Sequence, residues 1–498
     1  MADRTSTVSE SPAPPEVRPR GAHLRPIHHV QRSVGLLGAM VSSFHPRKLP
    51  PMLRATYARE LVSWIFLPVM LGAIEGGTIA VVVKKSFSNV DGISPIALNI
   101  AIAILTAAPN FANLTSFIWA ALARGRAKVP FISALQLATS ILVGLIAFAP
   151  HNQFGLIMIA TLVVLARTCW TGVITLRSAV WRNNYPSASR ATIAGKMATM
   201  QSLMLAVAGW IVGEAMDWDS NSFHVVFPLL AFVGITGNQI YRKVRLRGQR
   251  RLARAELAGR AGPSFSLMPT SMLAAFIRSM REVATTLQDD KLYRGFMGWM
   301  FVFGFGNLMY IAPLTIVLSD QFHVSYAEGI MITTTIPLIV MPIAIPLWAK
   351  LLDRTHIIHF RAIHGWTFVA GTLAMWLATY LPAFWLFYVS SVLLGVGFAG
   401  GILAWNLGHQ HFAPAHKDGQ YMAVHVTLNG LRGVIAPIVA LWIFEWTRRK
   451  ELDTSIVFAI CVAVNSIGVL GFMAMGRSLR RAEQLVAGGD PALALPPK

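Results

Sequence analysis

Long apolar stretches, each about the length of a membrane-spanning helix, dominate the pattern of hydrophobic and polar residues along the chain. A helix rises about 1.5 Å per residue, so roughly 20 mostly apolar residues are needed to cross the hydrocarbon core. Six such stretches precede a long polar segment and six follow it, which predicts an all-α membrane protein of about twelve transmembrane helices. The expected helices cover residues 61–83, 96–121, 131–150, 155–177, 193–216, 222–241, 295–318, 326–349, 363–382, 384–407, 421–444 and 455–475.

Short matches relate the first six predicted helices to the last six at a nearly constant spacing. Each match falls at an equivalent point of the predicted topology, where chance similarity would scatter. The spacing predicts two six-helix bundles in parallel repeat, related by a pseudo-twofold axis along the membrane normal. The matched pairs, 228 to 235 residues apart, are Trp119 with Trp348, Leu122 with Leu351, Arg59 with Arg294, Trp64 with Trp299, Gly172 with Gly400 and Pro186 with Pro414.

The same pattern divides the chain into five segments. We expect a disordered basic N-terminal tail at 1–56, with an interfacial helix near 30–45, and a C-terminal tail at 478–498. The bundles are expected at 57–241 and 293–477, joined by a basic linker at 242–292. Within that linker, apolar residues recur on one face of a predicted helix at 272–287. That helix would lie on the membrane surface or pack on the ends of the bundles.

Composition and charge agree with a membrane protein. The chain has 498 residues, of which 54% are hydrophobic and 13% charged, whereas soluble domains are about a quarter charged. Its net charge of +21 comes from basic residues in the loops on one side of the predicted topology and at the two ends, which argues against nucleic-acid binding. By the positive-inside rule we expect both termini on the cytoplasmic side, in a protein of the inner membrane. Lys84, Lys85 and the run at 448–450 are exceptions, the latter offset by Glu445 and Glu451.

Several function classes lack their sequence signatures. The two cysteines, Cys169 and Cys461, lie in apolar stretches and form neither a disulfide framework nor a thiolate metal cluster. The chain has no Gly-x-x-x-x-Gly-Lys-Ser/Thr pattern, so ATP is not the visible energy source. Neither Gly-x-Ser-x-Gly nor His-Glu-x-x-His occurs. These observations predict no enzyme activity and no cofactor.

The loops after the second and eighth predicted helices resemble the loop signature of the major facilitator superfamily, Gly-x-Leu-Ala-Asp-Arg-x-Gly-Arg. After the eighth helix Leu351, Asp353 and Arg354 match, and the resemblance assigns them to a cytoplasmic gating loop. After the second helix the Leu-Ala pair remains, but Arg124 replaces the aspartate. The resemblance implies transport of a small molecule by alternating access between two bundles. Of the family's proton-coupling pattern in the fourth helix, Arg167 matches.

Glu75 is the one carboxylate placed deep in a predicted helix, about 21 Å from its start. A charged group at that depth is costly and marks a functional position by default. Arg167 lies at a similar depth in the fourth helix, and pairing with Glu75 would lower the cost of both charges. We therefore predict that Glu75 and Arg167 couple transport to protons, against the alternative of a purely structural pair.

A second set of polar residues is predicted to contact the solute. Arg432, Asn429 and His425 follow one another at spacings of three and four residues, which place them on one helical face. With no acid at its depth in that half, Arg432 would attract an anionic group of the substrate, or else bond backbone carbonyls. Asn110, Asn307 and Tyr310 are added as polar or aromatic residues inside predicted helices.

The leading hypothesis is secondary active, proton-coupled transport of a small organic solute, in a lipid bilayer and without nucleic acid or ATP. One alternative is a membrane-embedded enzyme or lipid-handling protein, with the histidine-rich loop as its site: His409, His411, His416 and His425. Solvated loop histidines are the simpler interpretation, so no metal is predicted. Another alternative is a non-transporting sensor on the same fold. The oligomeric state is not indicated.

Overall fold

The computed structural model describes residues 42–258, 269–414 and 417–487, and in that part of the chain all regular structure is helical. Residues 42–51 belong to a first unit that holds the short helix η1 (Pro46–Lys48), and the second unit comprises the rest. The 1–41 part of the predicted tail and His416 lie outside the described residues. The features below belong to the second unit.

The first half of this unit corresponds to the first six predicted helices. The first one is interrupted and forms two helices, while the second is extended by a short helix after a turn. Its elements are α2 (Pro51–Ala73), α3 (Gly76–Phe87), α4 (Pro95–Asn113), α5 (Ser116–Leu122), α6 (Lys128–Leu145), η2 (Ile146–Phe148), α7 (Gln153–Asn184), α8 (Ser187–Trp218), η3 (Ser220–Ser222) and α9 (Phe223–Tyr241).

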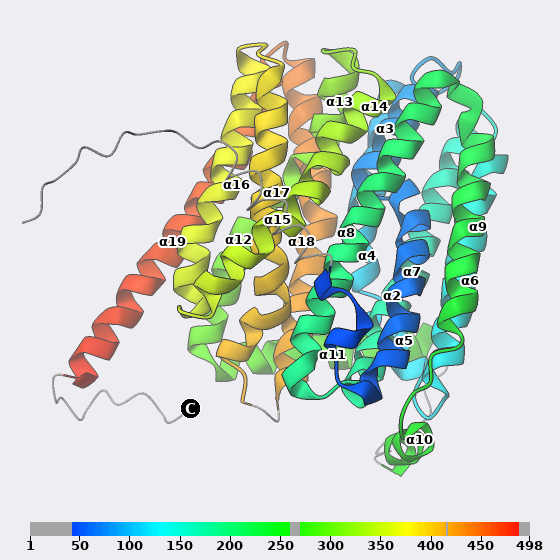
Figure 1. Cartoon of the computed structure of the whole chain (residues 1–498). Helices are drawn as coiled ribbons and strands as arrows, with labels where there is room; N and C mark the ends of the chain where they lie inside the picture. Colours follow the sequence, from blue (N-terminus) through cyan, green and yellow to red (C-terminus); the bar gives the residue numbers. More distant parts are fainter. Residues whose placement is uncertain (1–41, 259–268, 415–416, 488–498) are drawn as a thin grey trace, which may run out of the picture. The chain divides into compact units, whose positions relative to one another are not determined.

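The linker and the second half follow the same plan (Figure 1). The eighth span contains a π-helical turn, η4 (Met331–Thr335). The remaining elements are α10 (Gln249–Ala258), α11 (Pro269–Asp289), α12 (Lys291–Met309), α13 (Ile311–Asp320), α14 (Tyr326–Ile330), α15 (Ile336–Leu352), α16 (Ile357–Tyr380), α17 (Trp385–Leu407), η5 (Gly408–His411), α18 (Asp418–Arg449) and α19 (Ile456–Ala487).

Polar residues at the predicted helix starts act as N-caps. The side chains of Ser94, Asn152, Asp290 and Ser325 each accept a hydrogen bond from the backbone N–H three residues further on. Such caps satisfy one of the N–H groups that a helix start leaves without an intrahelical partner. The sequence therefore fixes locally where several of the long helices begin.

Ten of the twelve predicted spans are long and apolar enough to cross a membrane by length and composition alone. The other two are α8 and α16, with 32 and 24 residues, which are long enough but more polar. In α16 the polarity comes from Arg361 and His364, which point into the protein and are 4% and 0% exposed. The prediction of about twelve helices in two bundles is confirmed.

The structure shows the parallel repeat directly. The rings of Trp119 and Phe131 meet edge-to-face at 6.5 Å, and those of Trp348 and Phe360, each 229 residues further on, do so at 5.7 Å. The matched glycines, Gly172 and Gly400, also pack against equivalent positions. A Cβ added to Gly172 would meet Leu135 and Trp119, and one added to Gly400 would meet His364, the residue 229 positions after Leu135. The two halves therefore share their packing as well as their topology.

We call the two ends of the bundles the basic end and the far end. The basic end holds α5, α10 and α11, with the exposed Arg124 and Arg126, and lies at the bottom of Figure 1. The far end holds α3, α13 and α14, at the top. Apolar side chains such as Phe154 and Ile343, both 67% exposed, cover the outside of the bundles, as expected for contact with lipid.

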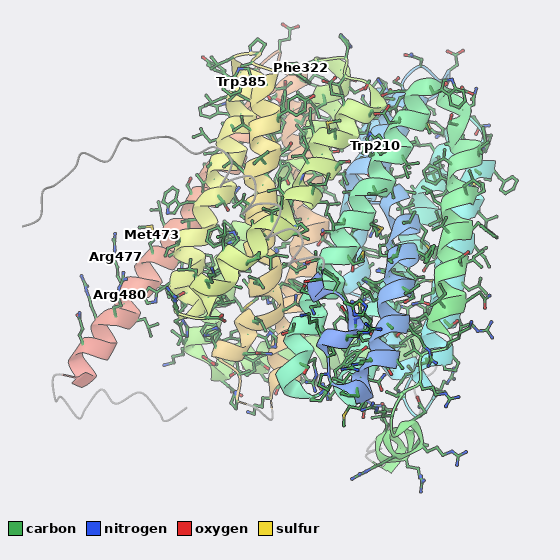
Figure 2. The ribbon with its side chains drawn as sticks, viewed as in Figure 1. Trp210, Phe322, Trp385, Met473, Arg477 and Arg480 are labelled. Atoms are coloured by element: carbon green, nitrogen blue, oxygen red, sulfur yellow. The ribbon has the colours of Figure 1, made fainter. Side chains whose placement is uncertain are left out.

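Aromatic and basic residues mark the margins of this apolar surface. Figure 2 shows Trp385 and Phe322 at the far end. Trp385 is 64% exposed, and the amphipathic ring of Trp is enriched at the membrane–water interface. Figure 2 also shows Arg477 and Arg480 on the last turns of α19, which stand off the bundle. Both arginines are exposed.

The described part of the linker contains two helices, α10 and α11, at the basic end. Helix α11 contacts α5 of the first half and α12 and α18 of the second. Among the α11 side chains that the structure describes, Val283 and Thr286 are buried, whereas Ile277 is 57% exposed. Helix α10 carries Glu256, which accepts hydrogen bonds from the Gly125 N–H and from Lys128, both at 2.7 Å.

Candidate functional site

The first membrane span is interrupted at Glu75. Helix α2 ends at Ala73 and α3 starts at Gly76, so Ile74 and Glu75 lie between two helical segments. The Arg167 guanidinium fills this break, donating to the Ile74 carbonyl at 2.6 Å and to Glu75 Oε2 at 2.7 Å. Backbone groups freed inside a membrane need such a partner. The predicted Glu75–Arg167 pair is present, and Arg167 also satisfies a backbone carbonyl at the helix interruption.

A cavity of about 1620 Å³ separates the two halves on the basic side of this pair. Glu75 and Arg167 line it, and their side chains are 29% and 8% exposed. Its wall continues along α7 and α8 to the exposed Arg124 and Arg126, and α11 lines it with Phe276 and Met280. The cavity therefore runs from the interrupted helix to the basic end.

Two predicted solute contacts meet on the cavity wall, where the halves touch. Asn110 of α4 and Asn429 of α18 both line the cavity, and the Asn429 side-chain N–H donates to Asn110 Oδ1 at 3.0 Å. The helices approach closely because α18 has glycine at 433, where a Cβ would lie 2.1 Å from the Asn110 Cβ. This hydrogen bond joins the two bundles at the cavity wall.

The other predicted solute contacts do not line the cavity in this state. Arg432 is 7% exposed and donates to the carbonyl of Met300 and, at 2.8 Å, to Asn429 Oδ1. His425 lies behind Trp405, with ring centroids 4.5 Å apart. Asn307 and Tyr310 are on the span formed by α12 and α13, away from the cavity wall. Arg432 thus bonds a backbone carbonyl, the alternative anticipated for it.

The predicted gating loop after α15 is open to solvent. Asp353 and Arg354 are exposed and Leu351 is half-buried. The corresponding loop after α5 differs, because there Glu256 of α10 holds the Gly125 N–H and Lys128. Gly125 has φ +71, a left-handed conformation that favours glycine. In this loop the carboxylate that contacts the backbone therefore comes from linker helix α10 and not from position 124.

At the far end the halves are joined by polar contacts. Lys84 of α3 pairs with Asp320 of α13 at 2.9 Å, and Lys85 donates to the Val324 carbonyl at 2.6 Å. Asp217 of α8 accepts from the backbone N–H groups that open α14, at 2.6 and 2.8 Å. A carboxylate is favoured at a helix N-terminus. These contacts explain why Lys84 and Lys85 depart from the positive-inside pattern.

A further far-end contact ties α4 to α18. The Asn99 side chain donates to Glu445 Oε1 at 2.6 Å, and Arg448 donates to Glu445 Oε2 at 2.6 Å. At the same end Gly213 lets α8 approach α14 closely, because a Cβ there would lie 2.6 Å from the Ala327 Cα. The far end is thus closed, while the cavity reaches the basic end.

Sequence reasoning missed two buried charged groups, Glu60 and Arg361, and a half-buried one, Glu256. Glu60 lies one residue before the predicted first helix at 61–83, is 2% exposed and accepts from the Trp181 indole at 2.9 Å. Arg361 lies before the predicted helix at 363–382, but α16 starts at Ile357 and carries it inside the bundle. Glu256 was not singled out. The sequence offers one signal for Glu256. The loop after the second predicted helix lacks the acidic residue of the signature, and the linker contains one.

A family model described as Major Facilitator Superfamily matches residues 61–437 and, in a second alignment, 295–491. The chain belongs to the Major Facilitator Superfamily. It is therefore a multi-pass membrane transporter and not an enzyme, and the twelve-helix arrangement above is the superfamily fold. Within the described residues, no group of three or more His, Cys, Asp or Glu side chains is placed to hold a metal ion.

Solved structures share this superfamily fold. The nucleoside transporter NupG aligns with TM-score 0.59 and 11% identity, covering 84% of this chain and 98% of the other. The peptide transporter POT in complex with sulfate gives 0.60 and 14%, covering 85% and 94%. The xylose transporter XylE from E. coli gives 0.56 and 12%, covering 84% and 97%. No curated protein sequence matches the chain.

Proposed function

We propose that this superfamily member is a proton-coupled secondary transporter of a small organic solute. The observation that carries the proposal is the Glu75–Arg167 pair, which lies on the cavity wall where the first span is interrupted. A carboxylate there is reached by water from the cavity and by protons. Interrupted helices are where many transporters hold their substrates and coupling ions.

The coupling follows from competition for Arg167. While Glu75 is ionised, its carboxylate occupies the guanidinium at 2.7 Å. When a proton from the cavity binds the carboxylate, Glu75 loses its charge and the attraction falls. Arg167 is then free to bind an acceptor group of the solute, which favours solute binding to the protonated protein. Release of the proton restores the pair and expels the solute.

The two ends supply the alternating access. The far end is held by ion pairs, helix-end contacts and small residues, all of which are non-covalent and reversible. Rocking of one bundle against the other would open this end and close the cavity at the basic end. If the basic end is cytoplasmic, both termini lie on the cytoplasmic side of the inner membrane and the cavity opens toward the cytoplasm.

The charge of the cavity favours a solute with a negative group. Besides Arg167, six arginines line it, whereas its acidic residues are Glu75 and Glu282. A surplus of guanidinium groups in a cleft attracts anions and raises their local concentration. The six arginines are Arg124, Arg126, Arg177, Arg182, Arg190 and Arg278.

Proton flux in proteoliposomes tests the proposal. Purified full chain is reconstituted with a trapped pH-sensitive dye, and organic anions, nucleosides, sugars and peptides are added outside in turn. We expect a transported solute to carry protons in the parent protein and in Glu214→Gln, an exposed carboxylate on α8. Glu75→Gln should still exchange labelled solute but carry no protons with it. Proton-linked flux through Glu75→Gln at the parental rate would overturn the proposed role.

A further inference from the structure

Two arginines are buried against the same turn of α12 in the second bundle. Arg361 of α16 and Arg432 of α18 are 4% and 7% exposed. The Arg361 guanidinium lies 6.0 Å from the centre of the Phe303 ring, and a Cβ on Gly304 would come within 2.2 Å of the Arg432 guanidinium. Because Phe303 and Gly304 are consecutive, both cations converge on one place, and their charges act on each other.

No carboxylate balances these charges among the residues that the structure describes. Arg361 contacts the His364 ring nitrogen Nδ1 at 3.4 Å, and Arg432 donates to Asn429 and to the Met300 carbonyl. The Nε–H groups of both arginines are buried without a hydrogen-bond partner in the described chain. The same holds for both ring nitrogens of His425, which is 1% exposed.

Such a cluster is costly unless a negative charge enters it. Burying one unpaired cation is unfavourable, and burying two that repel each other is more so. Arginine does not relieve this cost by releasing its proton, because the guanidinium group stays protonated in proteins. We propose that Arg361, Arg432 and His425 form an anion-binding site in the second bundle, which takes a carboxylate or another small monovalent anion.

The site lies one side chain behind the cavity wall. Asn429 lines the cavity and accepts from Arg432, while Trp405 lines it and packs against His425 with the two rings tilted. An anion in the cavity reaches the guanidinium groups when these two side chains rotate away. The unused Nε–H of each arginine, together with a neighbouring N–H, forms the fork that a carboxylate binds with two parallel hydrogen bonds.

This site differs from the Glu75–Arg167 pair of the first bundle. It would bind an anion whether or not the protein moves protons, so its test requires no transport. The carboxylate of a transported solute and an inorganic anion offer the same chemistry. Chloride and acetate, as sodium salts, separate the two sources: chloride binding indicates an inorganic anion, and binding of acetate alone indicates a carboxylate.

The experiment measures thermal unfolding of the purified full chain in a reference salt, sodium 2-(N-morpholino)ethanesulfonate, whose bulky anion has no carboxylate. Chloride or acetate then replaces this anion at constant ionic strength. We expect one or both to raise the melting temperature by about 2 °C or more at saturating concentration. Arg361→Met should lose this rise and, in the reference salt, melt no lower than the parent, because it removes an unbalanced charge. Arg480→Gln, an exposed arginine on α19, should keep the rise.

Asn429→Asp provides a second, independent variant. It places a carboxylate where Asn429 Oδ1 already lies 2.8 Å from the Arg432 guanidinium. We expect this built-in anion to raise the melting temperature in the reference salt and to abolish the response to chloride and acetate. The proposal is overturned if neither anion shifts the parent, or if Asn429→Asp is destabilised and Arg361→Met keeps the full response.

Discussion

Glu75 and Tyr310 occupy equivalent positions in the two halves of the chain, 235 residues apart, and each lies where its membrane span is interrupted. The first break carries a carboxylate paired with Arg167 and faces the cavity. The second carries a phenol that is 5% exposed. The repeat has thus kept the interrupted helix in both halves, with a carboxylic acid in the first and a phenol in the second. This difference supports the proposal that the first bundle carries the proton.

Replacing Arg167 separates its charge from its geometry. Arg167→Gln leaves Glu75 without a cation and the Ile74 carbonyl without its donor, whereas Arg167→Lys keeps the charge but presents a single ammonium group. We expect Arg167→Gln to lose at least about tenfold in proton-linked solute flux, and Arg167→Lys to lose less. Equal flux through Arg167→Gln and the parent would contradict the competition for Arg167.

The Lys84–Asp320 pair should set how firmly the far end is closed. Lys84 is 4% exposed, so Asp320→Lys places a second, partly exposed cation beside a buried one and should favour opening by about 1–2 kcal/mol, roughly 5–30-fold in population. The exchange Lys84→Asp with Asp320→Lys should restore closure. Labelling of Ser86→Cys by a membrane-impermeant thiol reagent, with Cys169 and Cys461 replaced by Ala, reports opening. No rescue by the exchange would disprove the pairing.

Two glycines form a matched test of helix approach at the far end. A Cβ on Gly213 would lie 2.6 Å from the Ala327 Cα, whereas one on Gly298 would meet nothing within 4 Å. Because a backbone atom is in the way, we expect Gly213→Ala to weaken closure by about 1–3 kcal/mol. Gly298→Ala should be neutral or up to about 1 kcal/mol stabilising. Thermal unfolding and the thiol labelling above are measured for both variants. Equal effects of Gly213→Ala and Gly298→Ala would contradict the close approach at Gly213.

The contact between α10 and the loop after α5 should protect α10 from protease cleavage. Lys128 is 3% exposed and its ion pair with Glu256 is 2.7 Å long, so Glu256→Gln removes a charge-assisted contact of about 2 kcal/mol. We expect trypsin to cut at Arg251 and Arg254 of α10 several-fold faster in this variant. Glu282→Gln, an exposed acid on α11, serves as control. Unchanged cleavage would show that Glu256 does not hold α10.

The sequence predicted most of the fold because a membrane span has a required length and composition, which is a local property. It predicted the Glu75–Arg167 pair for a related reason, since deep charges in a membrane seek partners. Contacts between distant elements left no local trace. Lys128 and Glu256 are 128 residues apart, and the depth of Arg361 depends on how α16 packs against α12.

Paired spin labels at the two ends test the rocking of the bundles most directly. One pair joins Ser88 and Gln321 at the far end, the other Asn183 and Lys350 at the basic end, all exposed. In the parent we expect a short far-end and a long basic-end distance. In Lys84→Ala a second population should appear, longer at the far end and shorter at the basic end in equal proportion. Far-end opening with an unchanged basic-end distance would contradict alternating access.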